Sequence, residues 1–143
     1  MTTDLKFGPD SPNRWAWVYQ ERASAYELLV AREDHQGNLL AAIQSIFALE
    51  GAQVVEFGAG TGRVTTLLVP RAAQVWAFDL TLAMAQVAAH KRQLSNCPNW
   101  LSAQADSRRM PLPSVCADLA IEGWSFLQIA VWYMSAWQQH FDM

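Results

Sequence analysis

Three closely spaced glycines follow a short β-prone run at residues 53–57. Gly58, Gly60 and Gly62 stand immediately before a stretch with helical spacing. Glycine is needed where a chain turns sharply or where a ligand approaches bare backbone. The N–H groups at the start of a helix donate hydrogen bonds and lie at the positive end of its dipole. The pattern therefore predicts a ligand-binding loop. A dinucleotide fingerprint requires a glycine where this chain has Arg63, which disfavours a nicotinamide dehydrogenase.

A carboxylate stands at or near the end of each of four predicted strands. Glu56 precedes the first glycine by two residues, Asp79 ends the second strand, Asp106 follows the third, and Glu122 ends the fourth. The carboxyl ends of parallel strands face one crevice. An acid at position 56 suits a ligand ammonium group better than a pyrophosphate. The two acceptor oxygens of Asp79 match the adjacent hydroxyls of a ribose.

Each of these residues also has a purely structural interpretation. Asp79 could be an acid favoured by the dipole of the next helix, and Asp106 a turn or cap residue. Glu122 could be a solvated carboxylate at a strand end. Trp124 could stack on a ligand, but we expect it to fill the core, as large aromatic side chains generally do.

The elements that position these residues alternate between strand and helix. Residues 1–13 form a loose lead-in, and helical spacing follows over 14–32 and again from Leu39 to Gly51. We predict strands over 53–57, 74–78, 100–103 and 115–121, and helices over 61–69, 82–94 and about 129–141. This order predicts one α/β domain, doubly wound around a mostly parallel sheet of about four strands. Two helices lead into the sheet, and helices are expected on both of its faces.

The composition is that of a globular protein. The chain has 143 residues, a formal net charge of −3, 52% hydrophobic and 16% charged residues, which excludes a disordered or fibrous chain. Mild acidity argues against nucleic acid as a partner, and Arg108-Arg109 is expected to be solvated. Cys97 and Cys116 show no metal-binding spacing, so we expect no metal, reduced thiols and a cytoplasmic protein. No secretory signal is visible, and the uncharged stretch 123–141 contains too many polar residues for a membrane span.

Taken together, the motifs resemble the class I S-adenosylmethionine-dependent methyltransferases, which have a Rossmann-like fold. The resemblance covers roughly residues 38–126 and rests on VVEFGAGTG (54–62), VWAFDL (75–80), AQADSRRMPLP (103–113) and ADLAIEGWSF (117–126). It implies a cofactor-binding core over 52–143, with strand order 3-2-1-4, after a lead-in and lid helices over 1–51. It also implies S-adenosylmethionine as methyl donor, S-adenosylhomocysteine as product and a small molecule as acceptor.

The resemblance also implies roles for single residues. Glu56, Gly58, Gly60 and Gly62 would hold the amino-acid end of the cofactor, and Asp79 would bind the ribose hydroxyls.

At the other end of the cofactor, Leu80 would lie against the adenine face. Asp106 would reach the adenine N6, with Ser107 beside it. Glu122 and Gly123 would line the methyl-donor side.

Three aromatic residues are candidates for the substrate side of the site. The resemblance places Tyr19 and Tyr26 on lid helices, and Trp124 follows the fourth strand. Aromatic faces stabilise a nearby cation such as a sulfonium. No general base is predicted.

The chain departs from the family in one respect, because the family's sheet has seven strands and only about four are predicted here. The fourth strand, 115–121, then becomes an exposed apolar edge, which invites pairing with another chain. The predicted helix over 129–141 is apolar on more than one side. We therefore expect either a truncated product or a homodimer formed through this edge and the last helix. A catalytically silent cofactor-binding module is the alternative function.

Overall fold

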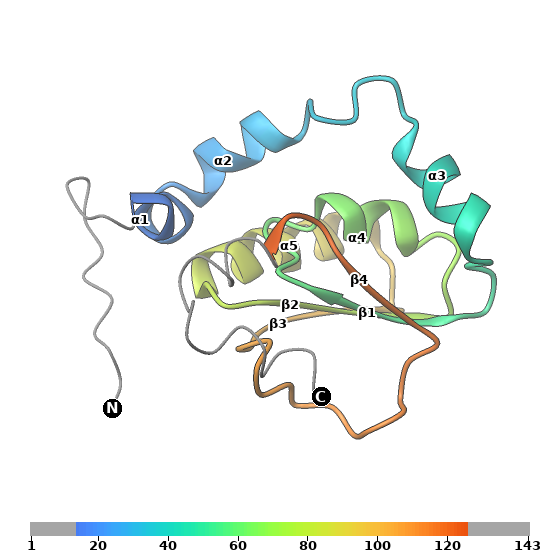
Figure 1. Ribbon diagram of the computed structural model, residues 1–143. Helices are drawn as coiled ribbons and strands as arrows, with labels where there is room; N and C mark the ends of the chain where they lie inside the picture. Colours follow the sequence, from blue (N-terminus) through green and yellow to red (C-terminus); the bar gives the residue numbers. More distant parts are fainter. Residues whose placement is uncertain (1–13, 126–143) are drawn as a thin grey trace.

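A four-stranded parallel sheet forms the centre of the computed structural model, which describes residues 14–125 (Figure 1). The strands are β1 (Gln53–Phe57), β2 (Gln74–Asp79), β3 (Trp100–Gln104) and β4 (Leu119–Glu122). Their order is β3-β2-β1-β4, as the resemblance implied. The α/β class and this order are confirmed.

The register of the sheet aligns the carboxyl ends of its strands. Phe57, the last residue of β1, pairs with Phe78 of β2 on one side and with Glu122 of β4 on the other. Asp79 at the end of β2 pairs with Gln104, the last residue of β3. Side chains and loops that follow the four strands therefore gather at one edge of the sheet.

Five helices in residues 14–125 lie on one side of the sheet (Figure 1). They are α1 (Arg14–Glu21), α2 (Ala23–Val30), α3 (Leu39–Ile46), α4 (Arg63–Leu68) and α5 (Leu82–Ser95). The core between helices and sheet contains Leu49, Val54, Val64, Leu68, Val75, Ala77, Ala88 and Trp100. The second face carries no helix within the described residues. The helix predicted over 129–141 lies outside them.

The prediction of one helix over residues 14–32 is wrong, because the chain leaves the helical conformation at Arg22. This residue has φ −132° and ψ 27° and separates α1 from α2. Neither glycine nor proline marks the break in the sequence. The Arg22 guanidinium lies 5.5 Å from the centre of the Trp17 ring. Helices α1 and α2 both pack against α5.

The fourth strand is shorter than predicted and begins at Leu119 rather than at Val115. Val115 has φ +57°, in the left-handed region, which a β-strand cannot contain. Its side chain is fully exposed. Within residues 14–125, β4 pairs only with β1, so its outer edge is open as predicted. No helix in this part of the chain is both long and apolar enough to span a membrane.

Candidate functional site

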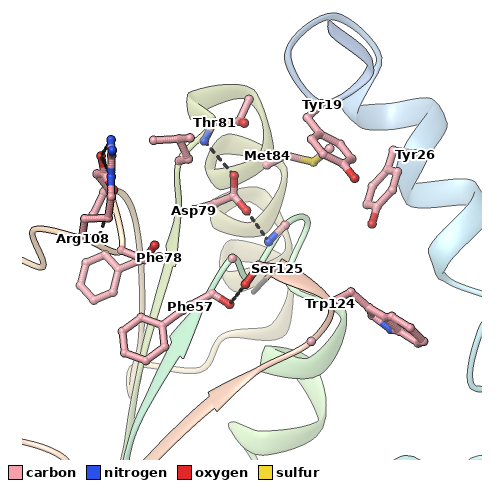
Figure 2. Close-up of a pocket in the computed structure, with 17 residues that line it drawn as sticks. Tyr19, Tyr26, Phe57, Phe78, Asp79, Thr81, Met84, Arg108, Trp124 and Ser125 are labelled. Atoms are coloured by element: carbon pink, nitrogen blue, oxygen red, sulfur yellow. Dashed lines mark hydrogen bonds and ion pairs between the residues drawn. The ribbon is translucent and has the colours of Figure 1, made fainter. Parts of the chain in front are cut away.

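A pocket opens at the carboxyl edge of the sheet, between the strand ends and the two N-terminal helices (Figure 2). The hollow measures about 810 Å³ with its open mouth included. Ten of the predicted site residues line it: Tyr19, Tyr26, Gly58, Gly60, Asp79, Leu80, Asp106, Ser107, Gly123 and Trp124. Glu56, Gly62 and Glu122 do not.

Two glycines of the loop after β1 line the pocket, and both need the left-handed conformation. Gly58 has φ +58° and Gly60 has φ +57°. A Cβ on Gly58 would lie 2.3 Å from the Cβ of Ser125, and a Cβ on Gly60 would lie 3.9 Å from Cε1 of Tyr26. The loop therefore presents bare backbone to the pocket, as the spacing of the glycines predicted.

Gly62 lies elsewhere. It has φ +81° at the N-cap of α4, and a Cβ there would lie 3.0 Å from Cζ2 of Trp100 and 3.3 Å from the Cβ of Ala88. Its small size lets α4 begin close against α5 and β3. The structure thus gives Gly62 a packing role on the core side of the loop, away from the pocket.

Asp79 lies at the centre of the pocket and ties its walls together. One oxygen, Oδ2, accepts a hydrogen bond from the N–H of Gly60 at 2.8 Å, and Oδ1 accepts one from the N–H of Thr81 at 2.8 Å. Burial raises the pKa of Asp79, and these N–H donors lower it. The bond to Thr81 fits the helix-start interpretation of this acid. A carboxylate has about four lone-pair sites, so acceptor capacity toward a ligand is left.

Glu56 lies behind the glycine loop rather than in the pocket. Its side chain is 2% exposed and accepts a hydrogen bond from Oγ1 of Thr65, on α4, at 2.5 Å. Burial raises the pKa of Glu56 to about 8, against the lowering effects of the Thr65 hydroxyl and the Arg63 charge. It borders a smaller cavity that it shares with Gly60 and Tyr26. At neutral pH this carboxyl is mostly protonated, which the sequence did not indicate.

At the other end of the pocket, Asp106 forms an ion pair with Arg108. The guanidinium Nε lies 3.0 Å from Oδ1, and the backbone N–H of Arg108 donates to the same oxygen at 3.0 Å. The expectation that Arg108 is merely solvated is wrong, because its side chain is half-buried and lines the pocket. Arg109 is exposed.

The turn after β4 covers part of the glycine loop. Ser125 donates from its Oγ to Glu122 Oε2 at 2.7 Å, and Figure 2 shows its contact with the backbone oxygen of Phe57. Glu122 lies beside a groove that α3 borders, and Gly123 lies in both the groove and the pocket. Trp124 is 74% exposed with φ +80°, so the expectation that it fills the core is wrong.

Two tyrosines cover the pocket from the N-terminal helices. Tyr19 of α1 and Tyr26 of α2 meet edge to face, with ring centres 5.2 Å apart (Figure 2). Trp15 stacks on Tyr19 at 6.2 Å. Burial raises the pKa of Tyr26 to about 12, so its hydroxyl stays protonated at neutral pH. The helices thus supply an aromatic wall where the sequence predicted a lid.

The sequence analysis missed several residues that line the pocket. These are Phe57, Phe78, Thr81, Met84, Ala105, Arg108 and Ser125. Phe57 and Phe78 could have been found, because each stands at or next to the end of a predicted strand. Nothing in the sequence marked Ser125, whose place depends on the turn that follows β4.

Comparison with known families identifies the class of the protein. A model of the methyltransferase domain family matches residues 54–140, which is more than half of the chain. The chain belongs to this family. The resemblance noted in the sequence is thereby confirmed, as is S-adenosylmethionine as the cofactor of this class.

Solved structures share the fold at low sequence identity. A candidate S-adenosyl-L-methionine-dependent methyltransferase from Methanococcus maripaludis is 16% identical with a TM-score of 0.70, covering 85% of this chain and 59% of that one. A SAM-dependent methyltransferase from Aquifex aeolicus is 20% identical with a TM-score of 0.64, covering 76% and 60%. The [4+2]-cyclase SpnF is 19% identical with a TM-score of 0.54, covering 58% and 32%.

These likenesses concern the fold alone, and the chain spans only part of its structural neighbours. It covers 38% of YcgJ from Bacillus subtilis and 26% of the phosphoethanolamine N-methyltransferase 1 from Haemonchus contortus. None of the curated protein sequences compared with the chain matches it.

Proposed function

We propose that the pocket binds S-adenosylmethionine and that the domain transfers its methyl group to a small molecule. The observation that carries the proposal is the bond between Asp79 and the N–H of Gly60. It joins the second strand's carboxylate to the glycine loop, so one ligand can touch both at once. Family membership supports S-adenosylmethionine as that ligand.

The arrangement of the walls suggests how the cofactor would lie. The backbone of Gly58 and Gly60 would face its amino-acid end, and Asp79 would accept hydrogen bonds from the ribose hydroxyls. Leu80 and Asp106, farther along the pocket, would contact the adenine. Glu56 would act on the ammonium group only after losing its proton, because burial raises its pKa.

The chemistry of methyl transfer fits a site of this kind. When bound, S-adenosylmethionine would supply a methyl group on a sulfonium: a lone pair of the acceptor would form the new bond to the methyl carbon, in line with the carbon–sulfur bond that breaks, and the electron pair of the broken bond would stay on sulfur. No covalent enzyme intermediate is needed, so correct positioning supplies much of the rate. The rings of Tyr19 and Tyr26 would place aromatic faces beside the sulfonium charge.

The test is calorimetric titration of the folded protein with S-adenosylhomocysteine and with its 2′-deoxy analogue. A hydrogen bond to a charged group contributes roughly 1.5–3 kcal/mol, so we expect the analogue to bind about 10- to 150-fold more weakly. Changing the ligand leaves the structural bonds of Asp79 intact, which a substitution of Asp79 would not. Equal affinity for both ligands contradicts the ribose assignment, and no binding of either contradicts the proposed cofactor.

A catalytically silent cofactor-binding module is the second candidate. The chain covers only 38%, 60% and 26% of the first three structural neighbours, and acceptor contacts could lie in the uncovered parts. Steady methyl transfer from S-adenosylmethionine across a panel of small-molecule acceptors excludes this candidate. S-adenosylhomocysteine binding without turnover on any of them supports it.

We also propose that the protein forms a homodimer through the open edge of β4. The apolar groove beside this edge supports the proposal, since it exposes 87% of Ile46 and 74% of Trp124. Light scattering of the purified protein at several concentrations tests it, and a monomeric mass throughout contradicts it.

Cys97 and Cys116 are free thiols, which supports a reducing cytoplasmic compartment.

A further inference from the structure

Helix α2, which brings Tyr26 to the pocket, has little apolar contact with the rest of the protein. Only Ala23 and Val30 of this helix are buried. Leu28 is 74% exposed and Leu29 is 61% exposed. Because apolar burial is the main force that fixes a helix, packing alone holds α2 weakly.

Two ion pairs join α2 and the turn after it to α5 and α4. Lys91 Nζ of α5 lies 2.6 Å from Glu27 Oε1. Arg63 Nε, on the first residue of α4, lies 3.2 Å from Glu33 Oε2. The first pair is the better shielded, since its side chains are 24% and 23% exposed, against 19% and 44% in the second.

The negative charge of the Glu27 carboxylate is compensated by the positive charge of Lys91. Its second oxygen, Oε2, is buried and has no hydrogen-bond partner among the described residues. Removing one partner of a shielded pair leaves the other charge poorly solvated, which costs more than the pair itself contributes. The docked position of α2 is therefore sensitive to Lys91.

Tyr26 is the neighbour of Glu27 in the chain and lines the pocket together with Gly60. Its Cε1 lies 3.9 Å from where a Cβ on Gly60 would be, and its ring meets Tyr19 edge to face. Lys91 itself does not line the pocket. A change at Lys91 therefore acts on the pocket indirectly, and the partner of its ion pair, Glu27, lies on α2 next to Tyr26.

We propose that the ion pair between Glu27 and Lys91 is a positioning contact that holds α2 closed over the pocket and thereby sets the affinity for the cofactor. The inference rests on the proposed cofactor. Lys91 is a positioning residue that acts through Tyr26 and not through contact with the ligand.

The experiment uses hydrogen exchange without ligand and calorimetry with S-adenosylhomocysteine. The variants are Lys91→Met, Glu27→Gln and the charge-reversed double variant Glu27→Lys/Lys91→Glu. Arg71→Met is the matched control, because it removes an exposed ion pair at 3.9 Å from Glu50, away from the pocket.

We expect Lys91→Met and Glu27→Gln to speed amide exchange over residues 23–30 and to weaken ligand binding about 3- to 10-fold, since a tenfold change corresponds to 1.4 kcal/mol. The double variant should restore most of the slow amide exchange and most of the ligand affinity, and Arg71→Met should change neither quantity. Raising the salt concentration from about 0.05 to 0.5 M should loosen α2 more in the wild type than in Lys91→Met, in which only the pair between Arg63 and Glu33 is left to be screened.

The two arms separate the inference from the proposed function. Exchange over 23–30 that is equal in wild type and Lys91→Met overturns the docking role of the pair. Faster exchange with unchanged ligand affinity overturns its effect on the cofactor. A folded wild type that binds no S-adenosylhomocysteine overturns the proposed function, while the exchange arm still decides whether the pair docks α2.

Discussion

Replacing Glu56 with glutamine should change how the stability of the protein depends on pH. The ordinary pKa of 4.5 rises to about 8 in the folded chain, because the side chain is buried against α4. Between these two values the folded chain holds a proton that the unfolded chain has released. The free energy of unfolding therefore falls as pH rises through this window. Above about pH 8 the whole contribution of the Glu56 proton has been lost, and the fall ends.

The size of the effect follows from the two pKa values. Each pKa unit corresponds to 1.36 kcal/mol, so the full penalty is about 5 kcal/mol, of which about 4 kcal/mol develops between pH 5 and pH 8.5. Glutamine cannot ionise, and its carbonyl oxygen can still accept the hydrogen bond from Thr65. We therefore compare the free energy of unfolding of Glu56→Gln with that of the wild type at each pH. The difference, in favour of the variant, should be about 4 kcal/mol larger at pH 8.5 than at pH 5.

Urea unfolding followed by tryptophan fluorescence at both pH values measures this difference. Glu50→Gln is the control, because Glu50 is exposed and its ion pair with Arg71 is long, at 3.9 Å. Its effect should be within about 0.5 kcal/mol at both pH values. If Glu56→Gln also differs from the wild type by the same amount at both pH values, Glu56 ionises normally and the reasoning from burial is refuted.

Three further substitutions test other parts of the site. Asp79→Asn should lower the affinity for S-adenosylhomocysteine about 10- to 150-fold, measured by calorimetry; unchanged affinity would show that this carboxylate does not bind the ligand. Gly58→Ala should reduce stability by about 2–4 kcal/mol, because its Cβ would collide with Ser125 at 2.3 Å, whereas Gly51→Ala, with nothing within 4 Å, should lose only ~1–2 kcal/mol in the same thermal unfolding assay. Equal losses at the two glycines would contradict the contact with Ser125. Asn99→Ala should reduce stability by about 1–3 kcal/mol, because the Asn99 amide donates to two backbone carbonyls after α4 at 2.9 Å. A loss below about 0.5 kcal/mol would mean that water takes over these hydrogen bonds in the variant.

The sheet could be predicted from the sequence because its local signals agree with one another. The runs at 53–57, 74–78 and 100–103 are short, β-prone and bounded by turn residues, and each lies within one residue of the observed strand. Helix α5 was predicted for a similar reason, since Thr81 precedes a long helical pattern. The observed N-cap makes no side-chain hydrogen bond, so the helix begins there without the contact that the residue type suggests.

The features that were missed depend on tertiary structure. Arg22 breaks the first predicted helix although arginine is a good helix former, and Val115 adopts a left-handed conformation that its side chain disfavours. Glu56 and Asp79 are both acids at strand ends, yet one faces α4 and the other the pocket. Glu56 pairs with Ala77, two positions before Asp79, so both acids lie on the same face of the sheet, and it is the packing of α4 that encloses Glu56.

The pairing of β4 with β1 joins the parts of the chain that are farthest apart in the sheet. Val54 and Leu119 are register partners although 65 positions separate them, whereas Val54 and Val75 are only 21 apart. Closing the longer loop costs more chain entropy, so β4 should join the sheet late in folding. In the described structure β4 is the shorter of the two edge strands, with 4 residues against 5 in β3, so it should also be the first strand to open in the native state, with the fastest amide exchange. Gly123 and Ser125 follow β4, so the wall they form would detach while Asp79 and the glycine loop stay folded. Two walls of the same pocket would then belong to cooperative units of unequal stability.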